Sequence, residues 1–176
     1  MRVIAGQYRG RRLAAPPGTD VRPTSDRVRE ALFSILGDIT GARVLDLYAG
    51  SGALAIEALS RGAASATLVE NDRDALAAIR ANLEPLADAE AEVVRGDALT
   101  WLRGIRGPYD LVFLDPPYSS AGKLAEPLSR ALPAALSPNA LIVSESDKRD
   151  PLTLAFPLED ERTYGNTRIA IHRAPH

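Results

Sequence analysis

The sequence predicts a doubly wound α/β fold with a mostly parallel sheet. From residue 43 onward, short apolar strands alternate with helical segments, which is the pattern of successive βαβ units. The uninterrupted apolar run at 111–114 favours a parallel strand covered on both faces. The length of 176 residues fits one domain, and 45% hydrophobic residues are enough to form a core.

The N-terminal part is expected to differ from the rest. Residues 1–24 should form a basic arm with a linker, and residues 25–176 the main domain. Two short segments separated by glycines, Val3–Ala5 and Arg11–Leu13, are typical of a β-hairpin. A helix should follow, capped by Thr24, Ser25 or Asp26, with an apolar stripe at positions 28, 31, 32, 35 and 36. Arg27 and Arg29 lie off this stripe, so we expect them to face outward.

The main domain divides into expected strands and helices in alternation. The strands are 43–47, 66–70, 92–95, 110–114 and 141–145, and the helices between them are 53–61, 73–84, 98–103 and 122–135. After residue 150 the pattern becomes strand-like at 151–158 and 167–172. These two segments predict a closing antiparallel hairpin.

Composition excludes several classes of mechanism. Cysteine is absent, so the chain has no thiolate nucleophile and no cysteine zinc site. Its two histidines, His172 and His176, both lie in the last five residues, so we expect neither a Ser-His-Asp triad nor a histidine metal centre. No apolar run approaches the ~20 residues that span a bilayer, and the start of the chain is too polar for a signal peptide. We expect a metal-free cytoplasmic protein.

Charge is distributed unevenly along the chain. Residues 1–29 have a balance of +5, whereas the remainder has a balance of −7. A basic arm beside an acidic body is typical of nucleic-acid binding, although a solvated arginine-rich surface would have the same charge. The candidate RNA-contacting residues are Arg9, Arg11, Arg12, Arg22, Arg27 and Arg29.

A glycine-rich turn follows the first strand. Gly50 and Gly52 permit a tight turn into a helix and close approach of a ligand to the backbone. Read as Gly50-x-Gly52-x-x-Ala55, the turn also matches the loose dinucleotide-binding fingerprint. However, a carboxylate at Asp46 would repel a pyrophosphate and attract an ammonium group. The turn therefore favours a ligand with a cationic amino-acid end, such as S-adenosylmethionine (SAM).

Polar residues also end the next two strands. Glu70 lies 20 residues after Gly50, where a carboxylate can accept hydrogen bonds from ribose hydroxyls of either NAD or SAM. Asp97 can accept a hydrogen bond from an adenine amino group. Asp72 is better explained as a helix cap than as a ligand contact. The residues expected to contact the cofactor are Asp46, Tyr48, Ala49, Gly50, Ser51, Gly52, Glu70, Asn71, Gly96, Asp97, Ala98 and Asp115.

The motif Asp115-Pro116-Pro117-Tyr118 directly follows the strand at 110–114. The two prolines remove backbone donors, so the segment presents carbonyls together with the Asp115 carboxylate. Such an acceptor site suits a planar group with N–H donors, and Tyr118 adds a face for stacking. A neutral amine held in this way turns its lone pair toward an electrophile. These four residues are the candidate catalytic residues.

At these residues the chain resembles a known family. Asp115–Tyr118 is similar to the Asp/Asn-Pro-Pro-aromatic signature of SAM-dependent amino-methyltransferases. The blocks Arg22–Phe33, Leu47–Leu54 and Glu57–Arg61 resemble the RsmD-type family of small-subunit (16S) ribosomal RNA guanine-N2 methyltransferases more closely. Further similarity is found at 3–13 and 164–167, so the resemblance covers essentially the whole chain. The family often has Phe where Tyr48 and Tyr118 stand.

The resemblance implies a seven-stranded methyltransferase sheet with its last strand antiparallel. It also implies that Asp46, Gly50 and Gly52 meet the methionine end of SAM, Glu70 the ribose, and Asp97 with Ala98 the adenine. Asp115 and the Pro116 carbonyl would hold the guanine N2 amine while Tyr118 stacks on the base. The implied partner is 16S RNA in the small subunit or an assembly intermediate, and we expect a monomer.

Other functions are consistent with parts of this pattern. The residues themselves suit adenine N6, cytosine N4 or another amine as well as guanine N2, so the resemblance alone selects guanine. A NAD-dependent oxidoreductase would explain the glycine turn and Glu70, but it would leave Asp46 and Asp115–Tyr118 unexplained. An RNA-binding module with a degenerate cofactor pocket would lack transfer activity.

Overall fold

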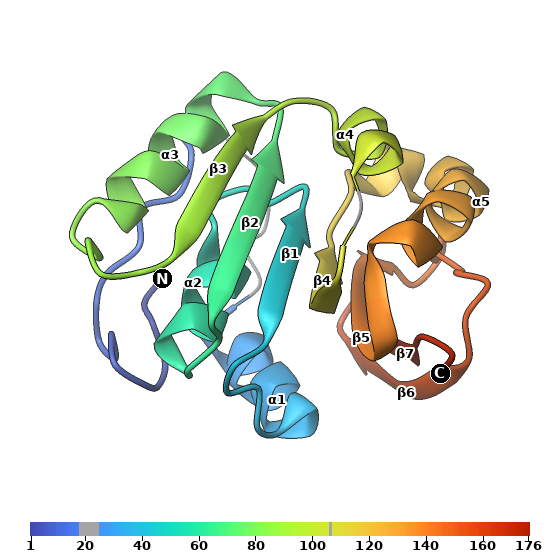
Figure 1. Ribbon diagram of the computed structural model, residues 1–176, viewed down its shortest axis with the longest axis horizontal. Helices are drawn as coiled ribbons and strands as arrows, with labels where there is room; N and C mark the ends of the chain where they lie inside the picture. Colours follow the sequence, from blue (N-terminus) through green and yellow to red (C-terminus); the bar gives the residue numbers. More distant parts are fainter. Residues whose placement is uncertain (18–24, 106) are drawn as a thin grey trace.

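A central seven-stranded sheet with helices on both faces organises this protein (Figure 1), whose computed structural model describes residues 1–17, 25–105 and 107–176. The elements in chain order are α1 (Asp26–Leu36), β1 (Arg43–Leu47), α2 (Ala53–Ser60), β2 (Ser65–Glu70), α3 (Arg73–Leu83), β3 (Ala91–Arg95), α4 (Ala98–Gly104), β4 (Tyr109–Leu114), the 3₁₀ turn η1 (Tyr118–Ser120), α5 (Ala121–Ala131), the 3₁₀ turn η2 (Leu132–Ala135), β5 (Leu136–Asp147), β6 (Leu158–Tyr164) and β7 (Thr167–Arg173).

The strand order confirms the expected doubly wound topology. The sheet runs β3-β2-β1-β4-β5-β7-β6, with β1 to β5 parallel and β7 antiparallel to both of its neighbours. The arrowheads of β1, β2 and β3 point to one edge of the sheet (Figure 1). From β1 the chain continues to β2 and β3 on one side, and it then returns to β4 on the other side of β1. The carboxyl edge at this switch point is the expected ligand site.

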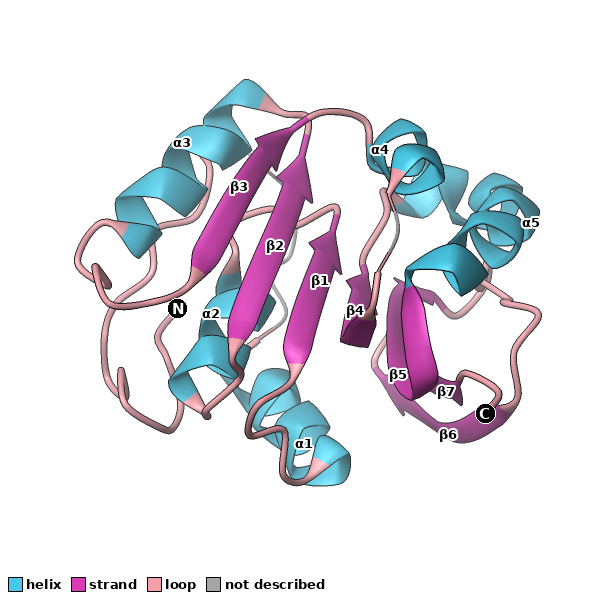
Figure 2. Ribbon diagram, viewed as in Figure 1, coloured by secondary structure: helices cyan, strands magenta, loops and turns pink. Residues whose placement is uncertain are grey.

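Two apolar layers cover the faces of the sheet (Figure 2). On one face α1, α2 and α3 bury residues such as Phe33 and Ile56, and on the other α4 and α5 bury Leu102 and Leu128. Because side chains alternate along a strand, Phe113 and Leu114 enter opposite layers. None of the helices in the described ranges is long and apolar enough to cross a membrane.

The closing hairpin begins later than the sequence predicts. We expected its first strand at 151–158, but β6 is Leu158–Tyr164. The apolar residues that suggested a strand, Leu152 and Leu154, are buried in a loop against the α4–α5 layer. The actual strand is polar because β6 is an edge strand, and charged side chains are typical of such edges.

The N-terminal segment packs against the main body rather than extending from it. Its two halves pair through one antiparallel bridge, Arg2 with Arg12, and through backbone bonds such as Val3 N to Arg11 O at 2.9 Å. Neither half forms a strand. Val3 and Tyr8 are buried against α2, and a Cβ on Gly6 would lie 1.9 Å from the Ser60 carbonyl oxygen. Gly6 therefore permits the close contact with the end of α2.

The structure corrects the expected orientation of Arg29. We expected it to face outward with Arg27, which is exposed, but Arg29 is fully buried. The buried side of α1 contains Arg29, Leu32 and Phe33, whereas Ile35 is 37% exposed. Val28, Leu32 and Leu36 of the expected stripe do pack on the core. The buried side is nevertheless rotated toward Arg29 and Phe33, because a charged residue with buried partners need not face solvent.

A buried ionic network explains why Arg29 lies inside. Its NH1 is 3.5 Å from Glu57 Oε2, and neither side chain is exposed. Glu57 also accepts hydrogen bonds from the backbone N–H groups of Ile4 at 2.9 Å and Ala5 at 3.1 Å, and from Arg61 Nε at 2.9 Å. One carboxylate thus joins α1, α2 and the N-terminal segment.

We expect Glu57→Gln to lower the free energy of unfolding by about 3 kcal/mol, because it removes the buried carboxylate that faces Arg29 and leaves only the part-exposed Asp26, at 2.5 Å, as its counter-charge. Urea denaturation of the whole protein would measure this change. Glu126→Gln is the matched control, since Glu126 also pairs with an arginine at i+4 but both side chains are 80% exposed. The control should cost ~0.5 kcal/mol or less, and equal losses in the two variants would contradict the role of Glu57.

Candidate active site

The glycine-rich turn between β1 and α2 adopts a left-handed backbone. Gly50 has φ 61° and Gly52 has φ 81°. A Cβ on Gly52 would lie 3.1 Å from Leu68 Cδ2, whereas one on Gly50 would meet nothing within 4 Å. Gly52 is thus required by the turn and its packing. Gly50 leaves space in which a ligand can approach the backbone closely.

Glu70 holds this turn in place. Its Oε2 accepts a hydrogen bond from Gly50 N at 2.7 Å, and its Oε1 accepts from the backbone of Asn71 at 2.9 Å and Asp72 at 3.0 Å. Because β1 and β2 are parallel neighbours, the residue that ends β2 lies beside the turn that follows β1. Glu70 is therefore positioned at the turn, as the sequence predicts, and it also organises the turn.

Asp46 lies near the carboxyl end of β1, just before the turn. It is 1% exposed, and its Oδ2 accepts a hydrogen bond from Ala55 N at 3.3 Å. Burial raises the pKa of Asp46 well above its ordinary value; the Ala55 bond opposes this shift and the Glu70 charge adds to it. A buried acid of this kind would be stabilised by a cation bound above it.

Tyr48 is an unusual member of the turn. It has φ 62° although it is not glycine, and its hydroxyl is buried with no hydrogen-bond partner. Burial, with a contribution from the Asp97 charge, raises the pKa of Tyr48 to about 12. A buried hydroxyl without a partner has a free-energy cost that a ligand atom beside it could offset.

Two of the predicted polar residues cap helices. Asp72 accepts from Ala75 N at 2.8 Å at the start of α3, which confirms its interpretation as a cap. Asp97 accepts from Thr100 N at 2.9 Å at the start of α4, and this bond lowers the pKa of Asp97. Asp97 therefore remains an anionic acceptor at the same edge, next to the buried residue Ala98.

The Asp115–Tyr118 motif lies directly beside the glycine turn. Leu47 pairs with Leu114 in the parallel register of β1 and β4, so the following residues, Tyr48 and Asp115, leave the sheet next to each other. Pro117 precedes η1, and the Tyr118 hydroxyl is 3.2 Å from Thr167 Oγ1 and 3.4 Å from Glu145 Oε1. The structure therefore brings the cofactor candidates and the acceptor motif to one edge.

The sequence did not indicate Glu145, which accepts a hydrogen bond from the Tyr118 hydroxyl and acts on the Asp115 carboxyl through its charge. Glu145 is 6% exposed on β5, and its charge is one reason why the pKa of Asp115 is raised well above its ordinary value. Burial is the largest cause, followed by the charges of Glu145, Asp46 and Glu70. The missed signal was a glutamate two residues after the apolar run 141–143 in β5.

The four carboxyl groups lie on the same side of the sheet. Val44, Leu68, Phe113 and Val143 share one apolar layer, and residues two positions further along each strand face the same way. Those residues are Asp46, Glu70, Asp115 and Glu145. Within the described ranges, no group of three or more acidic or histidine side chains is arranged to hold a metal ion. Together with the open backbone at Gly50, this acidic edge fits an organic cation.

The predicted RNA-contacting arginines have different environments. Arg9, Arg11, Arg12 and Arg27 are exposed, Arg29 is buried, and Arg22 lies outside the described residues. The N-terminal segment is connected to the glycine turn by Asn82, which was not predicted. Its Nδ2 donates to the carbonyl oxygens of Ala14 and Ser51, both at 2.9 Å.

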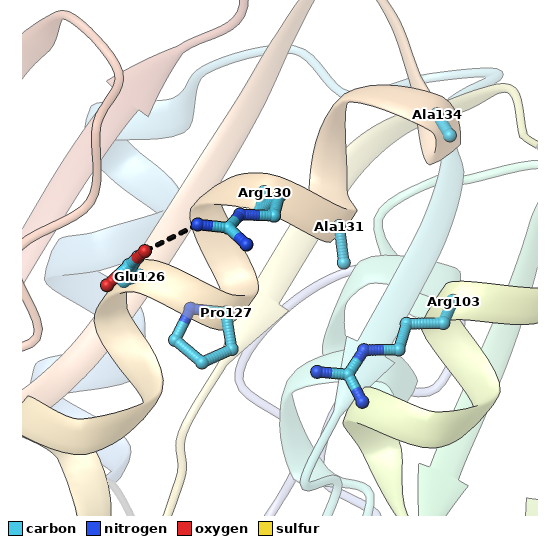
Figure 3. Close-up of a pocket in the computed structure, with 6 residues that line it drawn as sticks. All are labelled: Arg103, Glu126, Pro127, Arg130, Ala131 and Ala134. Atoms are coloured by element: carbon cyan, nitrogen blue, oxygen red, sulfur yellow. Dashed lines mark hydrogen bonds and ion pairs between the residues drawn. The ribbon is translucent and has the colours of Figure 1, made fainter.

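A hollow of about 460 Å³ lies between α4 and α5, away from the glycine turn and the Asp115–Tyr118 motif (Figure 3). It is lined by Arg103, Glu126, Pro127, Arg130, Ala131 and Ala134. Figure 3 shows Arg130 turned toward Glu126, its ion-pair partner. None of the predicted catalytic or cofactor residues lines this hollow.

We expect Asp115→Asn to raise the free energy of unfolding of the ligand-free protein at pH 8 by about 1 kcal/mol or more. A raised pKa in the folded state means that the ionised form of Asp115 destabilises the fold, by ~1.4 kcal/mol for each pKa unit. The gain should shrink as the pH falls toward 4, because Asp115 then becomes neutral in the wild type. Urea denaturation across this range would measure it.

Asp147→Asn is the control of opposite sign. Hydrogen bonds from Arg149 lower the pKa of Asp147 to about 2, so its ionised form stabilises the fold above the ordinary pKa of an aspartate. Its substitution should lower the stability at pH 8, and this loss should persist down to pH 5. A loss of stability in both variants at pH 8 would contradict the repulsion that we infer at Asp115.

Comparison with known proteins agrees with this geometry. A family model described as conserved hypothetical protein 95 matches residues 1–173. Ribosomal RNA small subunit methyltransferase D of Escherichia coli (strain K12) is 44% identical over 178 residues, which cover 98% of this chain and 89% of that protein.

Solved structures also include similar proteins. The Escherichia coli protein yhhF aligns with a TM-score of 0.88 and 39% identity, covering 99% of this chain and 98% of that one. An RNA methyltransferase from Salinibacter ruber, solved with S-adenosyl-L-homocysteine, shares the fold with a TM-score of 0.67 and 22% identity, covering 88% of this chain and 95% of that one. These matches favour the methyltransferase interpretation over the oxidoreductase. The chain therefore belongs to the RsmD-type family of ribosomal RNA methyltransferases.

Proposed function

We propose that this protein transfers a methyl group from SAM to the exocyclic N2 amine of a guanine in small-subunit (16S) ribosomal RNA. The observation that carries the proposal is the position of Asp115–Tyr118 beside the glycine turn, set by the pairing of Leu47 with Leu114. This position supports an acceptor site for an amine next to an acidic site for a cationic ligand. The rRNA methyltransferase relative supports RNA as the substrate.

Different residues at the sheet edge would contact different parts of SAM. Asp46 and the backbone at Gly50 and Gly52 would hold the cationic amino-acid end, since a buried carboxylate favours a nearby positive charge. Glu70 would accept from the ribose hydroxyls, and Asp97 with the Ala98 N–H would contact the adenine. When bound, SAM supplies an electrophilic methyl group on its sulfonium sulfur.

Asp115 and the Pro116 carbonyl would accept hydrogen bonds from the two N–H groups of the guanine amine. Both protons then point into the protein, and the nitrogen lone pair faces the methyl group. Tyr118, with a side chain that is 37% exposed, would stack on the base. The catalytic gain comes mainly from this alignment of amine, methyl carbon and sulfur.

A strong general base is not required for this reaction. The nitrogen loses a proton easily only after the new carbon–nitrogen bond has formed, and the proton can then pass to Asp115 or to water. Burial and neighbouring charges raise the pKa of Asp115, which makes it a better proton acceptor than an ordinary aspartate. Because a paired guanine amine is out of reach, the target must be single-stranded or extruded from its stack.

Labelled SAM and nucleoside mass spectrometry would test the proposed function. Purified protein should transfer the label to small-subunit RNA, free or assembled into subunits, and the product nucleoside should be N2-methylguanosine. Asp115→Ala should reduce transfer by at least ~10²-fold, while Asp115→Asn keeps part of the activity because its amide carbonyl still accepts.

SAM affinity, measured by calorimetry, is the control for both variants and should stay within severalfold of the wild type. Label in another nucleoside would refute guanine N2 as the target. Equal transfer by the alanine and asparagine variants would refute the acceptor role of Asp115.

The exposed arginines of the N-terminal segment form our proposed RNA-binding arm, with residues 25–176 as the methyltransferase domain. Arg9, Arg11 and Arg12 project from a segment whose apolar residues are buried against α2. Their charges are thus held close to the body instead of on a free tail. An RNA bound at the sheet edge could contact these charges through its phosphates.

Changing Arg9, Arg11 and Arg12 together to Ala should weaken RNA binding and reduce the slope of log affinity against log salt by up to ~3, since each lost phosphate contact removes about one unit. RNA affinity across a salt series would measure this. Arg103, Arg130 and Arg162 changed to Ala form a control with the same loss of charge at other exposed sites. Equal effects of the two triple variants would contradict a specific arm.

A further inference from the structure

We propose that Glu145 is a specificity-determining residue that accepts a hydrogen bond from guanine N1–H while Asp115 and Pro116 hold the N2 amine. This inference rests on the proposed function and deepens it, because it assigns the choice of base to a residue of this chain. It addresses a question that Asp115–Tyr118 leaves open, since that motif suits any exocyclic amine.

The sheet register places Glu145 beside Asp115. Leu114 on β4 pairs with Ser144 on β5 in a parallel ladder, so Asp115 and Glu145 follow at the same level. Both side chains face the layer that contains Phe113 and Val143. The influence of the Glu145 charge on the pKa of Asp115 agrees with this proximity.

Tyr118 connects Glu145 to the base-stacking position. Its hydroxyl donates to Glu145 Oε1 at 3.4 Å and lies 3.2 Å from Thr167 Oγ1 at the start of β7. The ring that would stack on the base and the carboxylate that would contact its edge are therefore held together. Because Glu145 is 6% exposed, an N–H group bound to it would be shielded from competing water.

The Watson–Crick edges of the bases make this contact selective. Guanine presents N1–H beside its N2 amine, so two donor positions face outward together. Adenine presents a bare N1 beside its N6 amine, and cytosine a bare N3 beside its N4 amine. A carboxylate would bind the guanine N1–H and repel the lone pair of either of the other bases, which is negative selection against them.

A base analogue separates the two contacts in the wild-type protein. 2-Aminopurine has an amine at the same carbon as guanine but no proton on N1. The measurement compares kcat/KM for two small-subunit RNAs, one with guanine and one with 2-aminopurine at the mapped target. Both RNAs are used in the form that the wild type methylates, either free or assembled into subunits. We expect kcat/KM to fall by roughly 10- to 100-fold, the effect of losing one hydrogen bond to a charged group.

Glu145→Gln should change the preference itself. Its amide can donate to the bare N1 of 2-aminopurine, so the ratio of guanine to 2-aminopurine activity should fall toward one or below. A purely structural effect would lower both activities equally and leave the ratio unchanged. SAM affinity by calorimetry should be retained, and Glu126→Gln, on the exposed face of α5, should keep the wild-type ratio.

Two results would overturn the inference. One is wild-type activity on 2-aminopurine RNA within about threefold of that on guanine RNA, and the other is an unchanged ratio in Glu145→Gln. Failure of the proposed function is distinguishable, because the wild type would then yield a labelled nucleoside other than N2-methylguanosine, or none.

Discussion

The convergence of four carboxyl groups at one edge of the sheet is the interaction on which the site depends. Asp46, Glu70, Asp115 and Glu145 come from four neighbouring strands, and parallel pairing leaves each at the same end and on the same face. Their mutual repulsion and burial raise the pKa values of Asp46 and Asp115. The folded protein therefore tolerates an unfavourable charge arrangement where its ligands bind, which is common at functional sites.

The four carboxyl groups form two pairs, one beside the glycine turn and one beside Tyr118. Asp46 and Glu70 lie by the glycine turn, where Glu70 fixes Gly50 through a 2.7 Å hydrogen bond. Asp115, which follows β4, and Glu145 on β5 lie on the other side of β1, where the Tyr118 hydroxyl contacts Glu145 and Thr167. A cation bound at the first pair would reduce the repulsion on Asp115, so binding of the cofactor and ionisation of the amine acceptor are thermodynamically coupled.

The sequence predicts the strand positions well because most strands of the parallel sheet contain an apolar run and alternate with helical segments. It also predicts the turn and the acceptor motif, since glycines and prolines restrict the backbone locally. The orientation of Arg29 was wrong and the buried Glu57 and Glu145 were not identified for one reason, namely that burial of a charged side chain depends on partners from distant segments. The loop containing Leu152 and Leu154 was mistaken for a strand because burial in a loop and burial in a sheet both require apolar residues.

The N-terminal segment is connected to α2 and to the glycine turn more closely than a separate arm would be. Glu57 binds the backbone of Ile4 and Ala5, while Asn82 bonds to Ala14 and to Ser51 within the glycine turn. A displacement of the segment by bound RNA would be transmitted to the turn through these hydrogen bonds, because the side chains that make them, Glu57 and Asn82, are themselves buried. Occupation of the cofactor turn could equally favour the docked segment, since coupling between two binding sites is reciprocal. These contacts between the N-terminal segment, α2 and the glycine turn would thus provide a route by which RNA bound to the segment and the cofactor influence each other.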